Sequence, residues 1–423
     1  METIIVTVFV IGYVFITLEH SVNINKTATA ILTGVLCWTI YMLGGGNASL
    51  VSHELKEHLA GISEILFFLL GAMTIVELVD AHDGFKIITS AIHTRDKVKL
   101  IWLLSFITFF LSAILDNLTT TIVMISLLRN LINDREDRLL FTGMVVIAAN
   151  AGGAWTPIGD VTTTMLWIGG QITTSNIMIE LFIPSLVCMI VPLLVVSKRL
   201  KGVIDSQNTK LQDSAISSFE RNLIFAVGIG SLVFVPVFKT ITGLPPYLGM
   251  LLGLSIVWIV TEFLHKKKES ETKNSFSVSK ALQKIDTSSI LFFLGILLCI
   301  AALESTHILS GMANWMTEKI GNMNVIVLGI GLLSAIIDNV PLVAACMGMY
   351  DLAQYPTDHY FWEFLAYCAG TGGSILIIGS AAGVAAMGLE KIDFFWYVKN
   401  ISLLALVGYF AGAGVYILIS YIM

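Results

Sequence analysis

Three aspartates stand inside long apolar stretches of this sequence, where ionisable side chains are rare. An ionisable group within a membrane-like stretch is costly to bury, so it usually marks an ion or proton pathway. Two of the aspartates are followed directly by an asparagine, and no Lys or Arg stands close to any of the three in the sequence. The positions are Asp116-Asn117 within residues 100–131, Asp160 within 139–169 and Asp338-Asn339 within 325–350. We expect these residues to form the functional site.

Oxygen atoms dominate the polar side chains around these aspartates. Carboxylates, amides, hydroxyls and free backbone carbonyls suit a small hard cation, and an oxygen-only ligand set argues against soft metals. We expect Na+ to be held by Asp116, Asp160 and Asp338, the groups that would also couple it to protons. The amide and hydroxyl candidates for the same site are Asn117, Asn150, Thr156 and Asn339, and further candidates are Glu77, Glu304, Thr119, Thr163, Ser374 and Ser380.

Each candidate also has a simpler structural explanation. An Asp at a hairpin tip can cap a helix, and a Thr in a membrane helix often bonds its own preceding turn. Glu77 and Glu304 occupy corresponding places late in matching stretches, where they could be proton acceptors or ordinary acids near a membrane face. The Asp-Asn pair occurs twice, each time before a stretch that cannot form a continuous helix, and this recurrence favours a functional role over capping alone.

The stretch around Asp160 is unsuited to a continuous helix. Gly152, Gly153, Pro157 and Gly159 lie within eight residues, and in a helix interior Gly costs roughly 1 kcal/mol and Pro roughly 3 kcal/mol. A membrane helix that breaks frees backbone groups, which is tolerated only where protein or a watery cavity satisfies them. We therefore predict a discontinuous membrane helix that lines an ion site.

Composition places all of these stretches in a membrane. The chain of 423 residues is 56% hydrophobic and only 13% charged, with a mean hydropathy of +0.84, whereas a soluble domain has about 25% charged residues. Apolar runs near 20 residues match the thickness of the hydrocarbon layer. The first run lacks a basic start and a cleavage site, so we expect it to be retained as a span. The five cysteines lie in apolar runs without paired spacing and are expected to be free thiols.

Three landmarks recur in order in the two halves of the chain. ILFFLLGAMTIVELVD at Ile65 corresponds to ILFFLGILLCIAALES at Ile290, LSAILDN ending at Asn117 to LSAIIDN ending at Asn339, and NAGGAWTPIGD at Asn150 to GTGGSILIIGS at Gly370. This pattern indicates a duplication. Residues 1–200 form the first repeat, with a hairpin at 100–131 and a broken helix at 139–169. Residues 201–222 form a cytoplasmic linker, and residues 223–423 the second repeat, with a hairpin at 325–350 and a broken helix at 361–389.

The resulting fold is an all-α polytopic membrane protein in which each repeat has five crossings and one re-entrant hairpin. An odd number of crossings inverts the second repeat relative to the first. Under this topology all but three of the 24 basic residues fall on one side, which is then cytoplasmic. The exceptions are Lys56, Lys239 and Lys319. Both termini are expected outside the cytoplasm, in the inner (cytoplasmic) membrane.

The strings LSAILDNLTTTIVM and GGAWTPIGDVTTTMLW closely resemble the NhaD-type sodium/proton antiporters of the ion transporter superfamily, and the resemblance covers essentially the whole chain. It implies two hairpins and two broken helices that surround the substrate in a mobile domain, and further helices that form a dimeric scaffold. Carboxylate carriers of the superfamily have Ser-Asn-Thr at the hairpin tips. This sequence has Asp-Asn at both tips, which favours a cation as the substrate.

The resemblance and the aspartates together predict secondary-active exchange of Na+ or Li+ for H+, because a proton and a cation would compete for the same carboxylates. Access would alternate by an elevator-type movement. The alternative is an anion permease of the same superfamily, for arsenite or a di- or tricarboxylate, and a channel is a further class. An enzyme is disfavoured because no nucleophile–base pair or metal motif is present. We expect a homodimer in the lipid bilayer, with no cofactor and no nucleic-acid partner.

Overall fold

Helices account for nearly all regular secondary structure in the computed structural model of this chain. The described residues are 1–17, 19–22, 24–44, 47–89, 92, 94–204, 216–266 and 276–422, with side chains omitted at 20, 21 and 89. Within them the only β-pairing is an isolated bridge between Asp96 and Val203. The centre of the predicted linker 201–222 and the lysine-rich segment near residue 270 lie outside the described residues.

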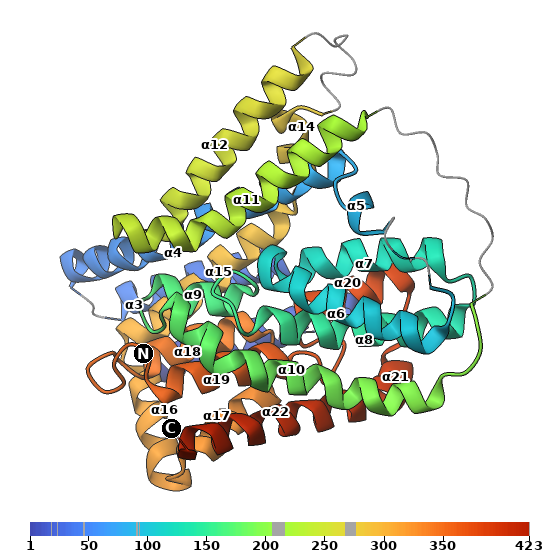
Figure 1. Ribbon diagram of the computed structural model, residues 1–423. Helices are drawn as coiled ribbons and strands as arrows, with labels where there is room; N and C mark the ends of the chain where they lie inside the picture. The colour runs from blue at the N-terminus through green and yellow to red at the C-terminus, as the bar shows by residue number, and fades with distance from the viewer. Residues whose placement is uncertain are drawn as a thin grey trace.

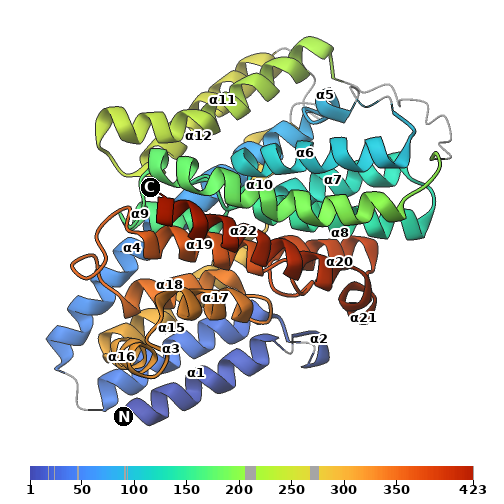
Figure 2. The same cartoon turned by 60° about the horizontal axis from the view of Figure 1, so that its bottom comes forward.

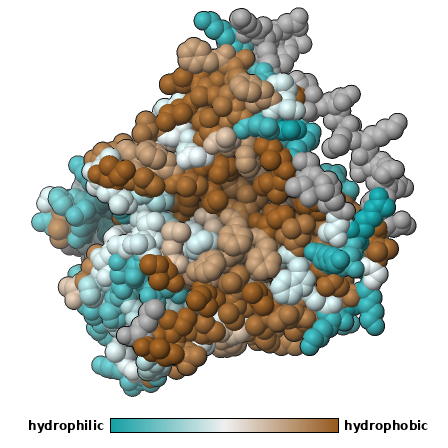
Figure 3. Space-filling view, in the orientation of Figure 1, coloured by the Kyte–Doolittle hydropathy of each residue, from teal (hydrophilic) through white to brown (hydrophobic). Residues whose placement is uncertain are grey.

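Eight helices in the described part of the chain are long and apolar enough to cross a membrane. They are α3 (Lys26–Leu43), α4 (Ala48–Ala81), α6 (Lys97–Leu115), α10 (Thr174–Arg199), α11 (Ser218–Thr242), α12 (Pro246–His265), α15 (Thr287–Ser305) and the continuous run Phe394–Ile422, which comprises α21 (Phe394–Tyr397), a π-helical turn (Val398–Ser402) and α22 (Leu403–Ile422). The shorter α1 (Glu2–Thr17) precedes them. The space-filling view shows an apolar band between two polar edges (Figure 3). The predicted all-helical membrane class is confirmed.

Both stretches that contain an Asp-Asn pair consist of two helices that meet at that pair. The first joins α6 to α7 (Asn117–Leu131) at Asp116, and the second joins α17 (Met323–Leu333) to α18 (Asn339–Met349) at residues 334–338. Both glycine-rich stretches are interrupted helices. The first consists of α8 (Arg135–Gly153) and α9 (Val161–Ile168), and the second of α19 (Tyr360–Gly372) and α20 (Ala381–Glu390).

Some helices differ from the sequence-based assignment. Helix α4 runs from Ala48 to Ala81, so it begins well before the apolar run of about 20 residues from which a span was expected. Asn47 caps this early start by accepting a hydrogen bond from Ser49 N. Four helices were not predicted: α2 (Glu19–Val22), α5 (Lys86–Thr89), α14 (Val278–Lys284) and α16 (Ile308–Ile320). They are short and too polar to show the long apolar runs on which the assignment rested.

We call the helix pairs α6–α7 and α17–α18 the two hairpins, and the interrupted helices α8–α9 and α19–α20 the two broken helices. The same contacts join each hairpin to the broken helix that follows it. Ser112 Oγ donates to the carbonyl of Ala149 at 2.6 Å, and in the second half Ser334 Oγ donates to the carbonyl of Ala369 at 2.8 Å. Glycine lets the helices approach closely here: a Cβ at Gly152 or Gly372 would meet a hairpin backbone oxygen at 2.2 or 2.0 Å, closer than such atoms can approach. The two halves therefore share the contacts that determine their backbone arrangement.

The helices fall into two groups by packing. In the group that we call the frame, α3 packs on α1 and α15, α4 on α12 and α15, and α11 on α12. The group that we call the central body contains α6 to α10 and α17 to α22, with α10 packed along α22 and α7 against α20. In Figure 2 the frame helices α11 and α12 lie above the central body, and α1, α3 and α15 lie below it; α11 and α12 are also at the top of Figure 1.

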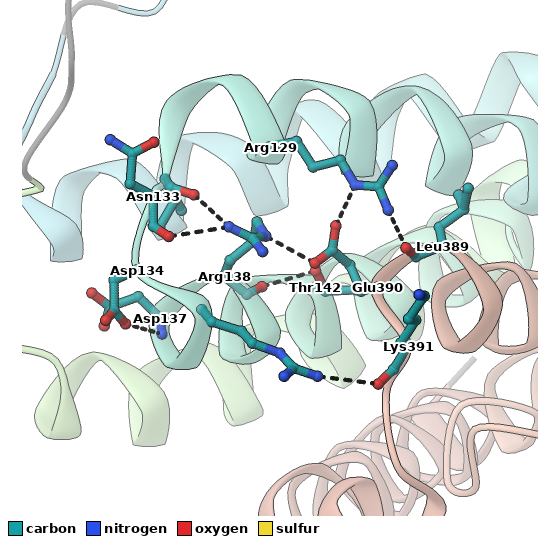
Figure 4. Close-up of polar contacts among 11 residues, drawn as sticks. Arg129, Asn133, Asp134, Asp137, Arg138, Thr142, Leu389, Glu390 and Lys391 are labelled. Atoms are coloured by element: carbon teal, nitrogen blue, oxygen red, sulfur yellow. Dashed lines mark hydrogen bonds and ion pairs between the residues drawn. The ribbon is translucent and has the colours of Figure 1, made fainter.

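An ion-paired cluster joins the two halves of the central body (Figure 4). Glu390 at the end of α20 accepts from Arg129 Nε at 2.6 Å and from Arg138 Nε at 2.8 Å. Arg129 also donates to the carbonyl of Leu389. The Glu390 side chain is only 3% exposed, so these charge-assisted bonds compensate its burial. The cluster fixes α7 and α8 of the first half to α20 of the second.

Candidate polar site between the hairpins and broken helices

Asp160 is the centre of the candidate site. It is the N-cap of α9, and its Oδ1 accepts hydrogen bonds from Thr162 N at 2.9 Å and Thr162 Oγ1 at 2.8 Å. The residue is 1% exposed. The break between α8 and α9 positions this carboxylate, since an Asp that begins a helix satisfies the free N–H groups of the first turn.

The tips of both hairpins converge on this carboxylate. Asn117 Nδ2 donates to Asp160 Oδ2 at 2.6 Å, and Asn339 Nδ2 lies 3.4 Å from Oδ2 and 3.5 Å from Oδ1. Asn117 and Asn339 are each 4% exposed. The structure therefore brings together three of the predicted site residues, Asn117, Asp160 and Asn339. The first and last of these are more than 200 positions apart in the sequence.

A chain of amide contacts extends from Asp160 to the second broken helix. Asn117 Nδ2 also donates to Asn150 Oδ1 at 3.0 Å, and Asn150 Nδ2 donates to Ser380 Oγ at 3.0 Å. Ser380 caps α20 by accepting from Gly383 N. Asn150 and Ser380, both predicted candidates, thus belong to one buried network with Asp160. The partners in this network are amide, hydroxyl, carboxylate and backbone groups.

Asp116 shares a small cavity with Asp160. The cavity has a volume of about 20 Å³, enough for one water molecule or ion, and its lining includes both aspartates, Thr164 and Ile158. The Asp116 carboxylate accepts from Thr119 N at 2.8 Å and from Thr119 Oγ1 at 2.9 Å. Its backbone has φ 87° and ψ 160°, a combination that only glycine adopts readily and that costs another residue about 1–3 kcal/mol. Such strain is typical of functional sites.

Asp338 lies apart from this cavity. Its carboxylate accepts from Val340 N at 3.1 Å, and it lines a separate cavity of about 70 Å³ with Tyr13, Glu19 and Lys26. The structure therefore does not gather the three aspartates into one ligand set. No basic residue stands near Asp338 in the sequence, but Lys26 of the frame lines the same cavity in the structure.

Capping and function are not alternatives at these positions. Asp116, Asp160, Asp338 and Ser380 each cap the helix that follows a break. Recurrence by itself does not separate capping alone from capping with a further role, because the same break needs a cap in each half. What distinguishes the residues is the second set of contacts: the Asp160 carboxylate receives amides from both hairpins, whereas the Asp338 carboxylate accepts from Val340 N at the start of its own helix.

The remaining candidates make local or separate contacts. Thr156 Oγ1 donates to the carbonyl of Ala113, Thr163 Oγ1 to that of Asp160, and Ser374 Oγ to that of Thr371. Glu77 forms an ion pair with Lys284 at 2.9 Å. Glu304 lines a different cavity together with His58. These contacts support the simpler structural explanation for Ser374 and Glu77.

Sequence reasoning omitted Lys26 from the site candidates, and it considered Thr162 only as one of several hydroxyls that could donate an oxygen. Thr162 is the second residue after a capping Asp, where a hydroxyl can reach back to the carboxylate, so the DVT spacing was a usable signal. Lys26 begins a span far from any motif. Nothing in the sequence shows that the start of this span faces the second hairpin.

Two large cavities lie between the frame and the central body at opposite ends of α4. One has a volume of about 620 Å³ and its lining includes Glu77, Asp80 and Thr119, the residue that bonds Asp116. The other has a volume of about 600 Å³ and is lined by Glu57, Glu64 and Glu304 among others. None of the three aspartates lines either cavity. Because Thr119 bonds Asp116 and lines the first cavity, the Asp116 region lies next to the cavity at the end where α4 terminates.

Comparison with known proteins identifies related transporters. Residues 13–363 match the CitMHS family, described as citrate transporters. The chain is 52% identical to "Sodium/proton antiporter 1" of Arabidopsis thaliana, over 97% of this chain and 71% of that protein. It is 48% identical to "Sodium/proton antiporter 2" of the same plant, over 97% of each. It is also 30% identical to "Na(+)/H(+) antiporter NhaD" of Vibrio parahaemolyticus, over 90% of this chain and 97% of that protein.

Proposed function

The chain belongs to the CitMHS transporter family and resembles its NhaD-type sodium/proton antiporters, and from this premise we propose that it exchanges Na+ or Li+ for H+ across a membrane. The observation that carries the proposal is the buried Asp160 carboxylate, which both hairpin tips approach without a neutralising Lys or Arg. A carboxylate in such a place takes up either a cation or a proton, since both relieve the cost of an isolated buried charge.

Competition at Asp160 and Asp116 would couple the two ions. A proton on either carboxylate removes the charge that attracts Na+, and a bound Na+ favours the ionised form. The cavity of about 20 Å³ between these residues is large enough for one small ion, and Thr164 lines it. Asn117 and Asn150 can turn amide oxygens toward a cation, because each Asn carries an acceptor as well as a donor.

Alternating access would move the central body past the frame. The hairpins and broken helices are joined to one another by the Asn117–Asn150–Ser380 contacts and by the Glu390 cluster, which supports their movement as one unit. The apolar surfaces between α15 and α18 and between α4 and α9 would then slide. We propose the inverted-repeat topology, with the basic side in the cytoplasm and both termini outside. Tags at the two ends should then be protease-accessible in intact spheroplasts.

The family also contains citrate transporters, so an anion permease is the second candidate. The site argues against it, because an anionic substrate needs positive groups and the network around Asp160 supplies carboxylate, amide and hydroxyl groups. Lys26 lies near Asp338, in the separate cavity of about 70 Å³. That cavity is too small for a tricarboxylate. Lys26 and Lys284 also line the cavity of about 620 Å³, but the acidic residues of its lining, Glu19, Glu77, Asp80 and Asp286, outnumber them.

Flux measurements on the purified protein in liposomes test the proposal. Na+ and Li+ should dissipate a preset pH gradient, and K+ and citrate should not. Asp160→Asn keeps the side-chain volume but removes the titratable charge, so it should abolish the response. A gradient dissipated by citrate rather than Na+ would establish the permease, and saturable Na+-driven proton movement in Asp160→Asn would refute the assigned site. We further propose that the protein is a homodimer in a cytoplasmic membrane and that it needs no bound cofactor.

A further inference from the structure

Lys239 makes a polar contact between the frame and the central body. It lies in the last turn of α11, a frame helix, and its ammonium donates to the carbonyl of Trp167 at 2.7 Å. The same ammonium lies 4.5 Å from the centre of the Trp167 ring. Trp167 belongs to the last turn of α9 in the central body and is 1% exposed.

The chemistry of this contact suits the end of a helix. The last carbonyls of a helix have no partner within it and carry partial negative charge, so a cation placed there is favourable. The face of an indole ring attracts the same cation. Lys239 therefore makes two favourable contacts with one residue, and both would be lost if α9 moved away from α11.

The position of the contact connects it to the candidate ion site. Helix α9 has only eight residues, Val161 to Ile168, with Asp160 as the cap at its start and Trp167 in its last turn. A short helix moves as a rigid piece, so α9 cannot change the surroundings of Asp160 without carrying Trp167 with it. Met165 and Ile168 of α9 also line the cavity of about 600 Å³, which lies at the opposite end of α4 from the cavity that Thr119 lines.

We propose that Lys239 is a positioning residue that docks the end of α9 on the frame and thereby favours the conformation in which Asp116 is approached from the Thr119 side. The inference rests on the proposed alternating access. Movement of the central body to expose the site at the opposite face breaks the Lys239–Trp167 contact, so the contact stabilises one conformation over the other.

A lysine near the end of a membrane helix has a simpler role, in which its stem covers apolar surface and its ammonium reaches water. The buried indole and the carbonyl partner argue against this role, because a snorkelling ammonium does not need a specific protein acceptor. The chain provides a matched control in Lys319, an exposed lysine at the end of α16, which the proposed topology places on the same side of the membrane.

Cysteine labelling of the purified protein in detergent tests the inference, because a maleimide then reaches both faces. The five native cysteines are buried. Ala385→Cys places a thiol on the wall of the Thr119-side cavity, and Ala344→Cys places one on the wall of the opposite cavity. Loss of a charge-assisted hydrogen bond changes an equilibrium on the order of tenfold. In Lys239→Met, labelling at Ala385→Cys should slow several-fold and labelling at Ala344→Cys should accelerate.

Lys239→Arg should restore most of the original ratio, since a guanidinium also donates and stacks on indole. Lys319→Met should leave both rates unchanged. Unchanged rates in Lys239→Met, or faster labelling at both cysteines as expected for general loosening, would overturn the inference. Labelling requires no ion flux, so failure of the antiport assay would leave this result interpretable, and failure here would leave the antiport proposal intact.

Discussion

The two hairpin tips carry the same LSAI-(L/I)-DN sequence but have different local structures. At the first tip Asp116 adopts φ 87° and ψ 160° and shares a cavity with Asp160. At the second, Asp338 adopts an unstrained φ of −47° and ψ of 135° and faces a cavity that contains Lys26. The broken helices differ in parallel, since Asp160 in the first corresponds to Ser380 in the second.

The difference separates the residues that serve structure in both halves of the chain from the residues that carry the proposed chemistry in one half. Ser112 and Ser334 make matching bonds, and every break is capped. The strained backbone and the carboxylate that both hairpins approach occur together in the first half. One half therefore carries the chemistry proposed here, while the second contributes Asn339 and Ser380 to hold it.

The sharpest test of this asymmetry replaces each of the two corresponding caps, Asp160 and Ser380, by a residue that lacks its functional group. Asp160→Asn should reduce Na+-driven proton exchange on the order of a hundredfold or more, because it removes the charged ligand of the network. Ser380→Ala removes one neutral hydrogen bond and should cost about two- to tenfold. Initial rates in liposomes measure both. Equal losses would mean that the halves contribute alike.

The two asparagines provide the next comparison. Asn117 donates to Asp160 at 2.6 Å and also to Asn150, whereas Asn339 lies at 3.4 Å or more. Asn117→Ala should therefore weaken the apparent Na+ affinity about tenfold or more, and Asn339→Ala by less. The concentration of Na+ that gives half-maximal exchange measures this order, and a larger effect of Asn339→Ala would reverse the assignment.

Glycine at the two tips should change stability in opposite directions. Asp116→Gly relieves a strain of about 1–3 kcal/mol, which outweighs the few tenths lost as a cap and the chain entropy of roughly 0.5–1 kcal/mol that glycine adds, so it should raise the unfolding temperature in detergent while abolishing exchange. Asp338→Gly relieves nothing and adds chain entropy, so it should destabilise the protein by about 1 kcal/mol. Stabilisation by both variants, or by neither, would contradict the strain argument.

The smallest effect concerns the starts of the two broken helices. Asp134 caps α8, whereas His359 caps α19 by accepting from Phe361 N at 3.1 Å. Burial lowers the pKa of His359 below its usual value of about 6.5. The fold therefore favours the neutral ring, and its stabilising contribution is present above about pH 6.5 and lost as the pH falls through the lowered pKa.

His359→Asn keeps a capping side chain without the titration. Between pH 7.5 and 5.5 the unfolding temperature of the wild type should fall more than that of His359→Asn, by a difference equivalent to a few tenths of a kcal/mol. Parallel curves would show that this histidine does not contribute.

The sequence allowed much of the fold to be predicted because membrane helices and their interruptions depend on local composition. The breaks after Gly153 and Gly372 and at both Asp-Asn pairs follow from residues that cannot continue a helix. Helices α14 and α16 were missed because polar residues divide them, and the early start of α4 because its first turns are polar.

The sequence allowed the residues of the candidate site to be named, but it did not show which of them lie together. Asp160, Asn117, Asn150, Asn339 and Ser380 were identified from their polar character in apolar stretches and do form one network. Two facts required the three-dimensional structure: Asp338 turns toward Lys26, and Asp116 adopts a glycine-like backbone. Neither depends on local sequence, since the two tips have nearly identical residues. Long-range packing against α1 and α3 of the frame distinguishes them.

Calorimetric titration of the purified protein with Na+ tests the central claim most directly. Measurements in buffers of different ionisation enthalpy count the protons released on binding. If Na+ and H+ compete for the carboxylates of the first half, binding should release protons and weaken as the pH falls, Asp160→Asn should abolish both effects, and Ser380→Ala should retain them. Sodium binding without proton release, or proton release that survives Asp160→Asn, would contradict the account.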